Sequence, residues 1–181
     1  MTRTIKLFLF LAATIFAAST IRAQAQTAAP IHQKDFIGEN PTADADIKTV
    51  SDYTNWIVAG DADKAKGLLA AGFKGYGPAP IDSVTADQEI AAWQENYKNT
   101  SNRKVDFVTE TFRVLSGNLQ GNWVSTWGDY TFTESGKTVK FPFQCTYHVT
   151  NGKIDISRIY YDRTYILMQL GYTLTPPPAA K

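Results

Sequence analysis

Apolar and polar residues alternate most regularly near the C-terminal end of the chain. In the segment 141–150, apolar side chains occupy every second position, namely Phe141, Phe143, Cys145, Tyr147 and Val149. This period of two predicts a strand with one face on a core. Asn151-Gly152 then tolerates the positive φ of a tight turn, and the apolar residues of 153–162 predict the returning strand. The pattern therefore predicts a β-hairpin.

The apolar spacing changes to that of a helix directly after this hairpin. Tyr165, Leu167, Met168 and Leu170 form one or two apolar turns, and Gly171 is a usual helix stop. We expect the last strand to end in an acidic residue and a short helix.

Three helices are predicted in the N-terminal half from apolar residues spaced three and four apart. The first stops at Gly60. Asp61 can cap the second, which places Leu68 and Leu69 on its inner face. A capping box at 85–88 opens the third helix.

Strand-like segments complete the second half. Residues 104–115 and 122–134 are rich in β-branched and aromatic residues and are bounded by glycine turns. With the hairpin they give four long antiparallel strands in meander order, and a short strand at 73–76 precedes the third helix. Helices first and a sheet afterwards predict an α+β fold, in which a curved antiparallel sheet wraps three helices around a conical cavity.

The N-terminal residues do not share this pattern. Basic residues precede the apolar run 7–18, and Ala23-Gln-Ala25 offers the small residues of a cleavage site, so residues 1 to about 25 are predicted to be a signal peptide. A membrane anchor is disfavoured, because the run is shorter than the roughly 20 residues needed to cross a bilayer. We expect a periplasmic or secreted protein with a flexible leader at 26–43, a domain at 44–175 and a Pro-rich disordered tail at 176–181.

Composition bounds the function. The 181 residues are 44% hydrophobic and 13% aromatic, which suffices for one domain with a packed core. A net charge of +1 gives no reason to expect a nucleic-acid partner. The single cysteine, Cys145, lies in the apolar row of a strand and is expected to be a small buried hydrophobe.

The residues that metals and cofactors require are scarce. The only histidines are His32 and His148, with no second ligand at metal-binding spacing, and no phosphate-binding or dinucleotide-binding glycine motif occurs. We expect no metal and no cofactor. Acid/base chemistry is the one catalytic class that this composition supports, with these candidates: Asp129, His148, Asp162, Tyr160, Tyr161 and Tyr76.

The C-terminal residues resemble a known family. Asn151-Gly-Lys-Ile154, Arg158, Tyr160-Tyr-Asp162 and Leu167-Met-Gln-Leu-Gly171 look like the signature of the nuclear-transport-factor-two-like (NTF2-like) superfamily, specifically its SnoaL-like branch. The run 58–73 resembles the helix, turn, helix and strand of the other half of that pattern. The resemblance covers about 44–175 and implies a cone-shaped NTF2-like fold.

Two branches of the family suggest reactions. In the epoxide-hydrolase branch an Arg-x-Asp works with a second Asp on the last strand. The matching positions here are Trp127-Gly128-Asp129 and Ile159, so the resemblance disfavours epoxide hydrolysis. In the polyketide-cyclase branch an inward Asp works near a His, and the comparable pair is His148 with Asp162.

Each catalytic candidate also has a structural interpretation. His148 lies in the row opposite Phe143 and Cys145, which allows a solvent-facing or interface position. Asp162 can cap the last helix, and Asp129 can pair with a basic residue on a neighbouring strand.

Aromatic residues supply the candidate ligand-binding set, which is also compatible with a core: Trp56, Tyr76, Trp93, Trp123, Trp127 and Tyr161. Two functions follow. One is a module that binds a small apolar or aromatic molecule in the cavity, and the other is a cofactor-free lyase, isomerase or cyclase with Asp129 or Asp162 as base. A cavity filled by its own side chains would instead favour a structural interaction domain.

The final predicted strand carries bulky apolar groups on both faces. One row holds Ile154, Ile156 and Tyr160, and the other holds Ile159 and Tyr161. An isolated monomer would expose one of these rows. We expect a homodimer through the outer face of the sheet, and the resemblance implies the same.

Overall fold

The computed structural model describes residues 32–79 and 83–175. The predicted signal peptide, the start of the leader and the Pro-rich tail at 176–181 lie outside these described residues. Within the described part, no helix combines the length and the apolar character that a membrane span requires.

Most helix ends coincide with the signals that the sequence predicts. Gly60 caps the C-terminal end of α1 with a φ of 103°, and Gly171 caps that of α4 with a φ of 96°, so both caps use a left-handed conformation that glycine adopts at little cost. The predicted capping box of α3 is formed by Thr85 and Gln88. The helical segments are η1 (Gln33–Asp35), α1 (Ala43–Ala59), α2 (Ala62–Gly67), α3 (Ala86–Asn99) and α4 (Arg163–Leu170).

A seven-stranded curved sheet contains all the described strands, in the order β1-β4-β5-β6-β7-β2-β3. The predicted meander β4 to β7 and its closing hairpin are confirmed. The strands are β1 (Ile37–Gly38), β2 (Leu69–Tyr76), β3 (Ser83–Val84), β4 (Thr100–Val114), β5 (Gly121–Glu134), β6 (Lys137–Thr150) and β7 (Lys153–Tyr161).

The helix arrangement and the strand directions differ from the prediction in one region. α2 ends at Gly67, so Leu69 starts β2 rather than lining a helix. β2 contains the strand expected at 73–76, and β3, which the sequence does not predict, also lies between α2 and α3. Because β2 pairs parallel with β7, the sheet is mixed rather than purely antiparallel. The backbone of Ile154 donates to the carbonyl of Leu68 at 2.9 Å where this pairing starts.

Part of the segment expected to be a flexible leader is paired. β1 lies along β4, with Ile37 opposite Val114 and Gly38 opposite Arg113. A polar network then ties the start of α1 to the sheet. Buried Asp46 accepts hydrogen bonds from Asn40, Thr42 and Asn122, at 2.9, 2.7 and 3.1 Å.

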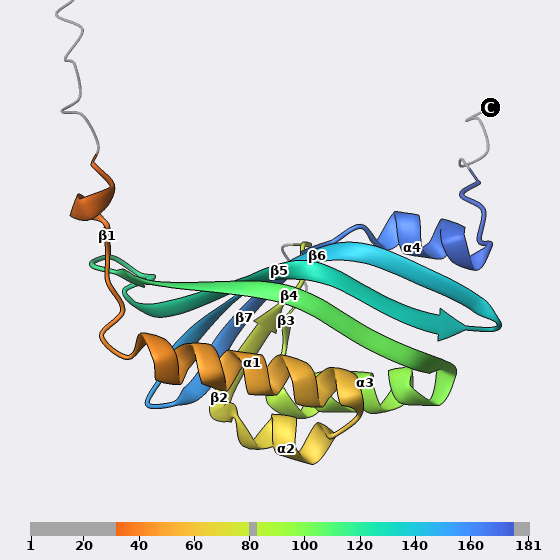
Figure 1. Cartoon of the computed structure of the whole chain (residues 1–181), viewed down its shortest axis with the longest axis horizontal. Helices are drawn as coiled ribbons and strands as arrows, with labels where there is room; N and C mark the ends of the chain where they lie inside the picture. The colour runs from red at the N-terminus through yellow and green to blue at the C-terminus, as the bar shows by residue number, and fades with distance from the viewer. Residues whose placement is uncertain (1–31, 80–82, 176–181) are drawn as a thin grey trace, which may run out of the picture. The chain divides into compact units, whose positions relative to one another are not determined.

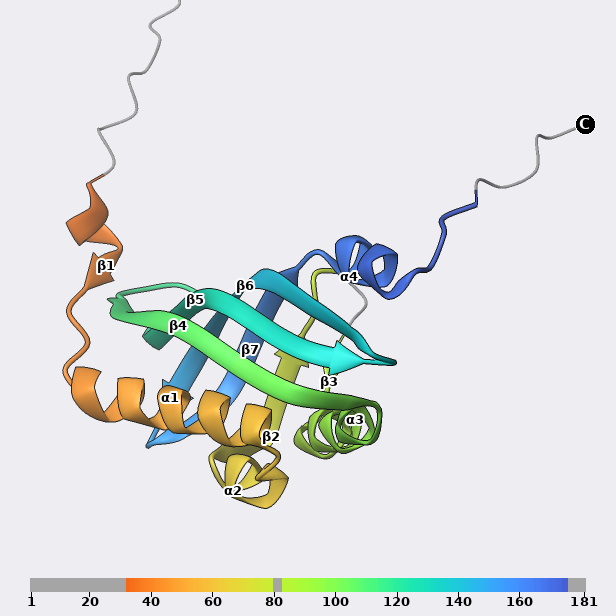
Figure 2. The same cartoon turned by 45° about the vertical axis from the view of Figure 1, so that its right-hand side comes forward.

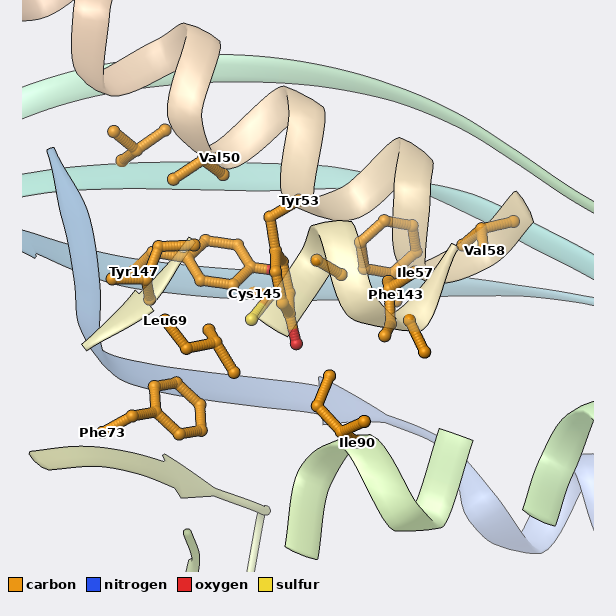
Figure 3. Close-up of a cluster of buried hydrophobic side chains, with 14 of the residues drawn as sticks. Val50, Tyr53, Ile57, Val58, Leu69, Phe73, Ile90, Phe143, Cys145 and Tyr147 are labelled. Carbon is orange, nitrogen blue, oxygen red and sulfur yellow. The ribbon is translucent and has the colours of Figure 1, made fainter. Parts of the chain in front are cut away.

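The core lies between the helices and one face of the sheet (Figure 3). The alternating row of β6, from Phe141 to Val149, is buried as the sequence predicts, and Val139 extends it. It packs against Val50, Tyr53 and Ile57 of α1. We call this side of the sheet, which α1, α2 and α3 cover, the inner face, and the opposite side the outer face (Figures 1 and 2).

Candidate functional site

One face of α3 brings a carboxylate and two aromatic rings to the inner face. α3 starts directly after its N-cap Thr85, and Glu89, Trp93 and Tyr97 lie on successive turns of it at a spacing of four residues. Tyr130, on the inner row of β5, meets the Trp93 ring edge-on with 6.1 Å between the ring centroids. Tyr53 reaches this group from α1, where its hydroxyl lies 3.5 Å from Glu89 Oε1. We call these five residues the Glu89 cluster.

Glu89 is half-buried and is held by neutral donors. Its Oε1 accepts hydrogen bonds from the Trp93 indole at 3.1 Å and from the Tyr53 hydroxyl at a long 3.5 Å. Burial raises the pKa of Glu89, and the two hydrogen bonds offset only part of that effect. The group can therefore take up a proton at a higher pH than an exposed glutamate.

No positive charge compensates this carboxylate within the described residues. Among the ion pairs of residues 32–79 and 83–175, none involves Glu89. Its Oε2 also has no hydrogen-bond partner in the described part of the chain, and it is not enclosed. One oxygen of Glu89 is thus oriented by the protein while the other is open.

The Tyr130 hydroxyl is a buried group of the same cluster that lacks a hydrogen-bond partner among the described residues. Burial raises the pKa of Tyr130 to about 12, so this hydroxyl stays protonated and can donate. The neighbouring Tyr97 differs, because its hydroxyl donates to the Ile57 carbonyl oxygen at 2.5 Å.

Aromatic contacts extend the cluster across the sheet. Tyr130 stacks on Phe132 and meets Phe141 edge-on, and Phe141 lies 5.5 Å from Tyr161, between ring centroids. α4 follows Tyr161 in the chain and places Ile166 against the same core. The Glu89 cluster therefore belongs to an aromatic row that runs from Trp93 on α3 through Tyr130 and Phe141 to Tyr161, just before α4.

The predicted ligand-binding residues are divided between the two faces of the sheet. Trp93 and Tyr161 lie in the aromatic row, and Trp56 packs partly buried against the core. Trp123 and Trp127 instead belong to the outer row of β5. The remaining residue of the set, Tyr76 on β2, has the Arg158 guanidinium over its ring at 4.7 Å. The structure thus brings together only part of this set.

Of the predicted catalytic residues, Asp129, Asp162 and His148 lie away from the Glu89 cluster, whereas Tyr161 lies in the aromatic row. Asp129 is on the outer face and pairs with Lys140 at 2.8 Å, so it is not an inward-facing base. Asp162 caps α4 by accepting from the Tyr165 backbone at 2.9 Å. These positions agree with the structural interpretations of the two acids, and any catalytic role for them stays a prediction.

His148 is paired with an aspartate, but not with Asp162. Its Nδ1 lies 2.6 Å from Asp155 Oδ1, and its ring packs on Trp123 with 4.8 Å between centroids. The other ring nitrogen is buried and has no partner in the described residues, and it faces Gly121, where a Cβ would collide with it. A β-bulge at His148 and Val149 brings Asp155 into this position, which residue alternation alone does not predict.

Glu89 is the functional candidate that the sequence interpretation missed. It precedes Ile90, which the apolar pattern assigns as the inner residue of that turn, and a polar residue beside an apolar stripe is usually assigned to solvent. A usable signal is present in the sequence, because Glu89, Trp93 and Tyr97 share one helix face.

Open hollows lie beside β1 and beside α2. The first has a volume of about 560 Å³, and the second, of about 380 Å³, includes Tyr97 of the Glu89 cluster. The described residues contain no group of three or more His, Cys, Asp or Glu side chains that could hold a metal ion.

Comparison with known proteins identifies the fold. No family model and no curated protein matches the sequence. Among solved structures, a candidate polyketide cyclase from Xanthomonas campestris pv. campestris matches with a TM-score of 0.58 and 15% identity, over 71% of this chain and 98% of that one. An LEH-like epoxide hydrolase from M. tuberculosis matches with a TM-score of 0.53 and 17% identity, over 72% and 92%.

A third match carries a ligand in its structure. It is a protein with a ketosteroid isomerase-like fold from Catenulispora acidiphila, in complex with trimethylamine, with a TM-score of 0.56 and 17% identity over 71% and 97% of the two chains. Proteins described as NTF2-like also match at similar levels. Identities this low establish architecture and not chemistry. The described part of the chain has the α+β, NTF2-like fold.

Proposed function

We propose that this protein binds a small aromatic or otherwise apolar molecule at the Glu89 cluster, between α3 and the inner face of the sheet. The observation that carries the proposal is the buried Tyr130 hydroxyl, which has no hydrogen-bond partner in the described structure, together with the open Oε2 of Glu89 in the same set of aromatic rings. Natural binding sites combine mostly apolar walls with a few convergent polar groups.

The energetic argument starts from the Tyr130 hydroxyl. A buried hydroxyl without a partner costs about 1 to 3 kcal/mol of stability, and such groups are rare in native proteins. A ligand group that accepts a hydrogen bond from Tyr130 would recover part of this cost. The aromatic rings beside it supply the apolar contact area that a small ligand needs.

Native mass spectrometry of protein purified from its own host tests the proposal. We expect a retained small molecule, and we expect Tyr130→Phe to retain less of it, because the phenyl ring keeps the packing and removes only the donor. Trp127→Phe on the outer face is the matched aromatic control and should retain the molecule fully. Wild-type protein that carries no molecule and shows no saturable binding of aromatic probes would contradict the proposal.

A second candidate function is cofactor-free acid/base catalysis with Glu89 as the base, in a lyase, isomerase or cyclase. The specific observation is the raised pKa of Glu89 in an aromatic environment, which moves a carboxyl group toward the range in which a general base is most effective. Proteins named for such chemistry share the fold. This role replaces the inward-facing aspartate of the sequence prediction.

Deuterium exchange separates this candidate from simple binding. A panel of cyclic ketones is incubated with the protein in D₂O, and incorporation next to the carbonyl is followed by NMR. Catalysis by Glu89 predicts exchange that Glu89→Gln abolishes and Asp129→Asn leaves unchanged. Exchange that persists in Glu89→Gln would exclude Glu89 as the base.

We also propose that the protein acts in the periplasm or outside the cell, after removal of residues 1 to about 25. The support is the apolar run followed by Ala23-Gln-Ala25. Mass analysis of the exported protein should find a new N-terminus near residue 26, and an intact Met1 in that fraction would refute the proposal.

A further inference from the structure

The charge of Glu89 is not paired with any basic side chain of the described residues. Both hydrogen bonds to this side chain come from uncharged groups, and both end on Oε1. Moving a carboxylate out of water is costly unless a proton or an opposite charge accompanies it. The protein supplies neither a lysine nor an arginine to Glu89 within the described residues.

Arg103, the arginine beside the cluster, donates its hydrogen bonds to backbone carbonyls and not to Glu89. Arg103 Nε donates to the Val58 carbonyl at 3.0 Å, and Nη1 donates to the Thr100 carbonyl at 2.7 Å. Its guanidinium lies over the Tyr97 ring at 4.7 Å from the centroid. Arg103 therefore shows that a ring of this cluster accepts a cation on its face, while it makes no ion pair with Glu89.

The rings nearest Glu89 have the properties that bind organic cations. The indole of Trp93 lies against the carboxylate, and Tyr130 meets the indole edge-on. Tryptophan and tyrosine faces attract cations, most strongly where water is excluded. A carboxylate with one open oxygen, set among such rings, is complementary to an ammonium group on an apolar body.

We infer that the molecule bound at the Glu89 cluster is an organic cation, a small amine protonated at neutral pH, whose ammonium group pairs with Glu89 Oε2 and contacts the Trp93 ring. This inference rests on the proposed binding function and specifies its ligand class. The amine brings the positive charge that the described residues do not supply, and Trp93 and Tyr53 hold the carboxylate in position through its other oxygen.

A matched pair of probes tests the inference. 2-Phenylethylamine is a cation at pH 7.5, and 2-phenylethanol has nearly the same size and shape without the charge. We expect isothermal titration calorimetry at low salt to show at least about tenfold tighter binding of the amine, since a desolvated ion pair with ring contacts is worth a factor of this order. Glu89→Gln should bring both probes to the same affinity.

Two controls distinguish the loss of the Glu89 charge from a loss of the folded structure. In Glu89→Gln the new side chain keeps an oxygen that accepts from Trp93 and Tyr53, so the variant should remain folded, which circular dichroism and thermal unfolding check. Asp129→Asn removes one carboxylate on the outer face and should leave the preference for the amine unchanged. A preference that is lost in Asp129→Asn and kept in Glu89→Gln would overturn the assignment to Glu89.

The remaining outcomes are distinguishable. Equal affinity for the two probes in wild-type protein would overturn the cationic ligand class and leave the binding proposal standing. If neither probe binds at millimolar concentration and native mass spectrometry finds no retained molecule, both proposals are wrong.

Discussion

A glutamate among aromatic rings titrates differently from one in water, and Glu89 shows the consequence for stability. Because burial raises its pKa, the folded state disfavours the ionised form. The contribution of Glu89 to the free energy of unfolding is therefore fully present below the ordinary pKa of glutamate, where the side chain is protonated. It is lost as the pH rises through the pKa that Glu89 has in the folded state.

Glu89→Gln removes this pH dependence. We expect the variant and the wild type to have similar free energies of unfolding near pH 4, and the variant to be the more stable of the two at pH 7. Urea unfolding at both pH values measures the difference. Glu95→Gln on the exposed side of α3 is the control, because an ion pair with Lys98 lowers the pKa of Glu95 and the small effect should have the opposite sign. A wild type that gains stability relative to Glu89→Gln toward neutral pH would contradict the argument.

Tyr130 and Tyr97 offer a second test at the scale of single residues. Tyr130→Phe removes a buried hydroxyl that has no partner in the described structure, and we expect the free energy of unfolding to rise by about 1 kcal/mol. Tyr97→Phe removes a hydroxyl that donates to Ile57, and we expect a loss of about 1 kcal/mol. Denaturant unfolding without ligand measures both, and a destabilised Tyr130→Phe would indicate a hydrogen bond to the hydroxyl.

Residue type and alternation predicted burial better than they predicted chemistry. The row from Phe141 to Val149 and the burial of Cys145 are confirmed. Alternation assigned His148 to the row opposite that one, which agrees with its position on the outer face. Its pairing with Asp155 depends on a bulge, and the position of Glu89 depends on how α3 is rotated against the sheet. Neither depends on local sequence alone.

At the scale of elements, local signals located the ends of most helices and missed three strand contacts, two of which join segments distant in sequence. The segment Leu69-Ala-Ala-Gly72 has little β propensity, yet it belongs to β2 because β7 offers a parallel edge. β1 is only two residues long and is paired with β4. Pairing with a distant strand decided both cases, and a propensity scale does not contain that information.

The network around Asp46 is expected to secure the start of α1. Asp46→Ala would leave the Asn40, Thr42 and Asn122 donors without their common acceptor, and we expect a loss of about 2 to 3 kcal/mol. Asp52→Ala is the matched control, because its i,i+4 pair with Lys48 is exposed and should be worth less than about 0.5 kcal/mol. Thermal and denaturant unfolding measure both variants, and equal losses would count against the network.

At the scale of the whole molecule, the outer face of the sheet keeps large apolar side chains in contact with solvent. Val108 is 54% exposed, Trp127 is 42% exposed and Tyr160 is 50% exposed. These residues lie on β4, β5 and β7, on the side away from α1, α2 and α3. A patch of this kind on a sheet is typical of a protein interface.

We propose that a second copy of the chain covers this face and forms a twofold homodimer. Sedimentation equilibrium at micromolar concentration should give the mass of a dimer, and Trp127→Glu should shift it toward the monomer, since the substitution would bury charge against the partner. Asp52→Ala on α1 should leave the dimer intact. A monomer mass for the wild type at these concentrations would refute the dimer.

The parallel pairing of β2 with β7 also constrains the order of events during folding. β2 lies in the first half of the chain, and its partner is the last strand of the described sheet, so this part of the sheet cannot close before the C-terminal hairpin exists. Contacts this distant in sequence slow folding. If the chain is exported as proposed, with its N-terminus first, it would remain incompletely folded until β7 had emerged.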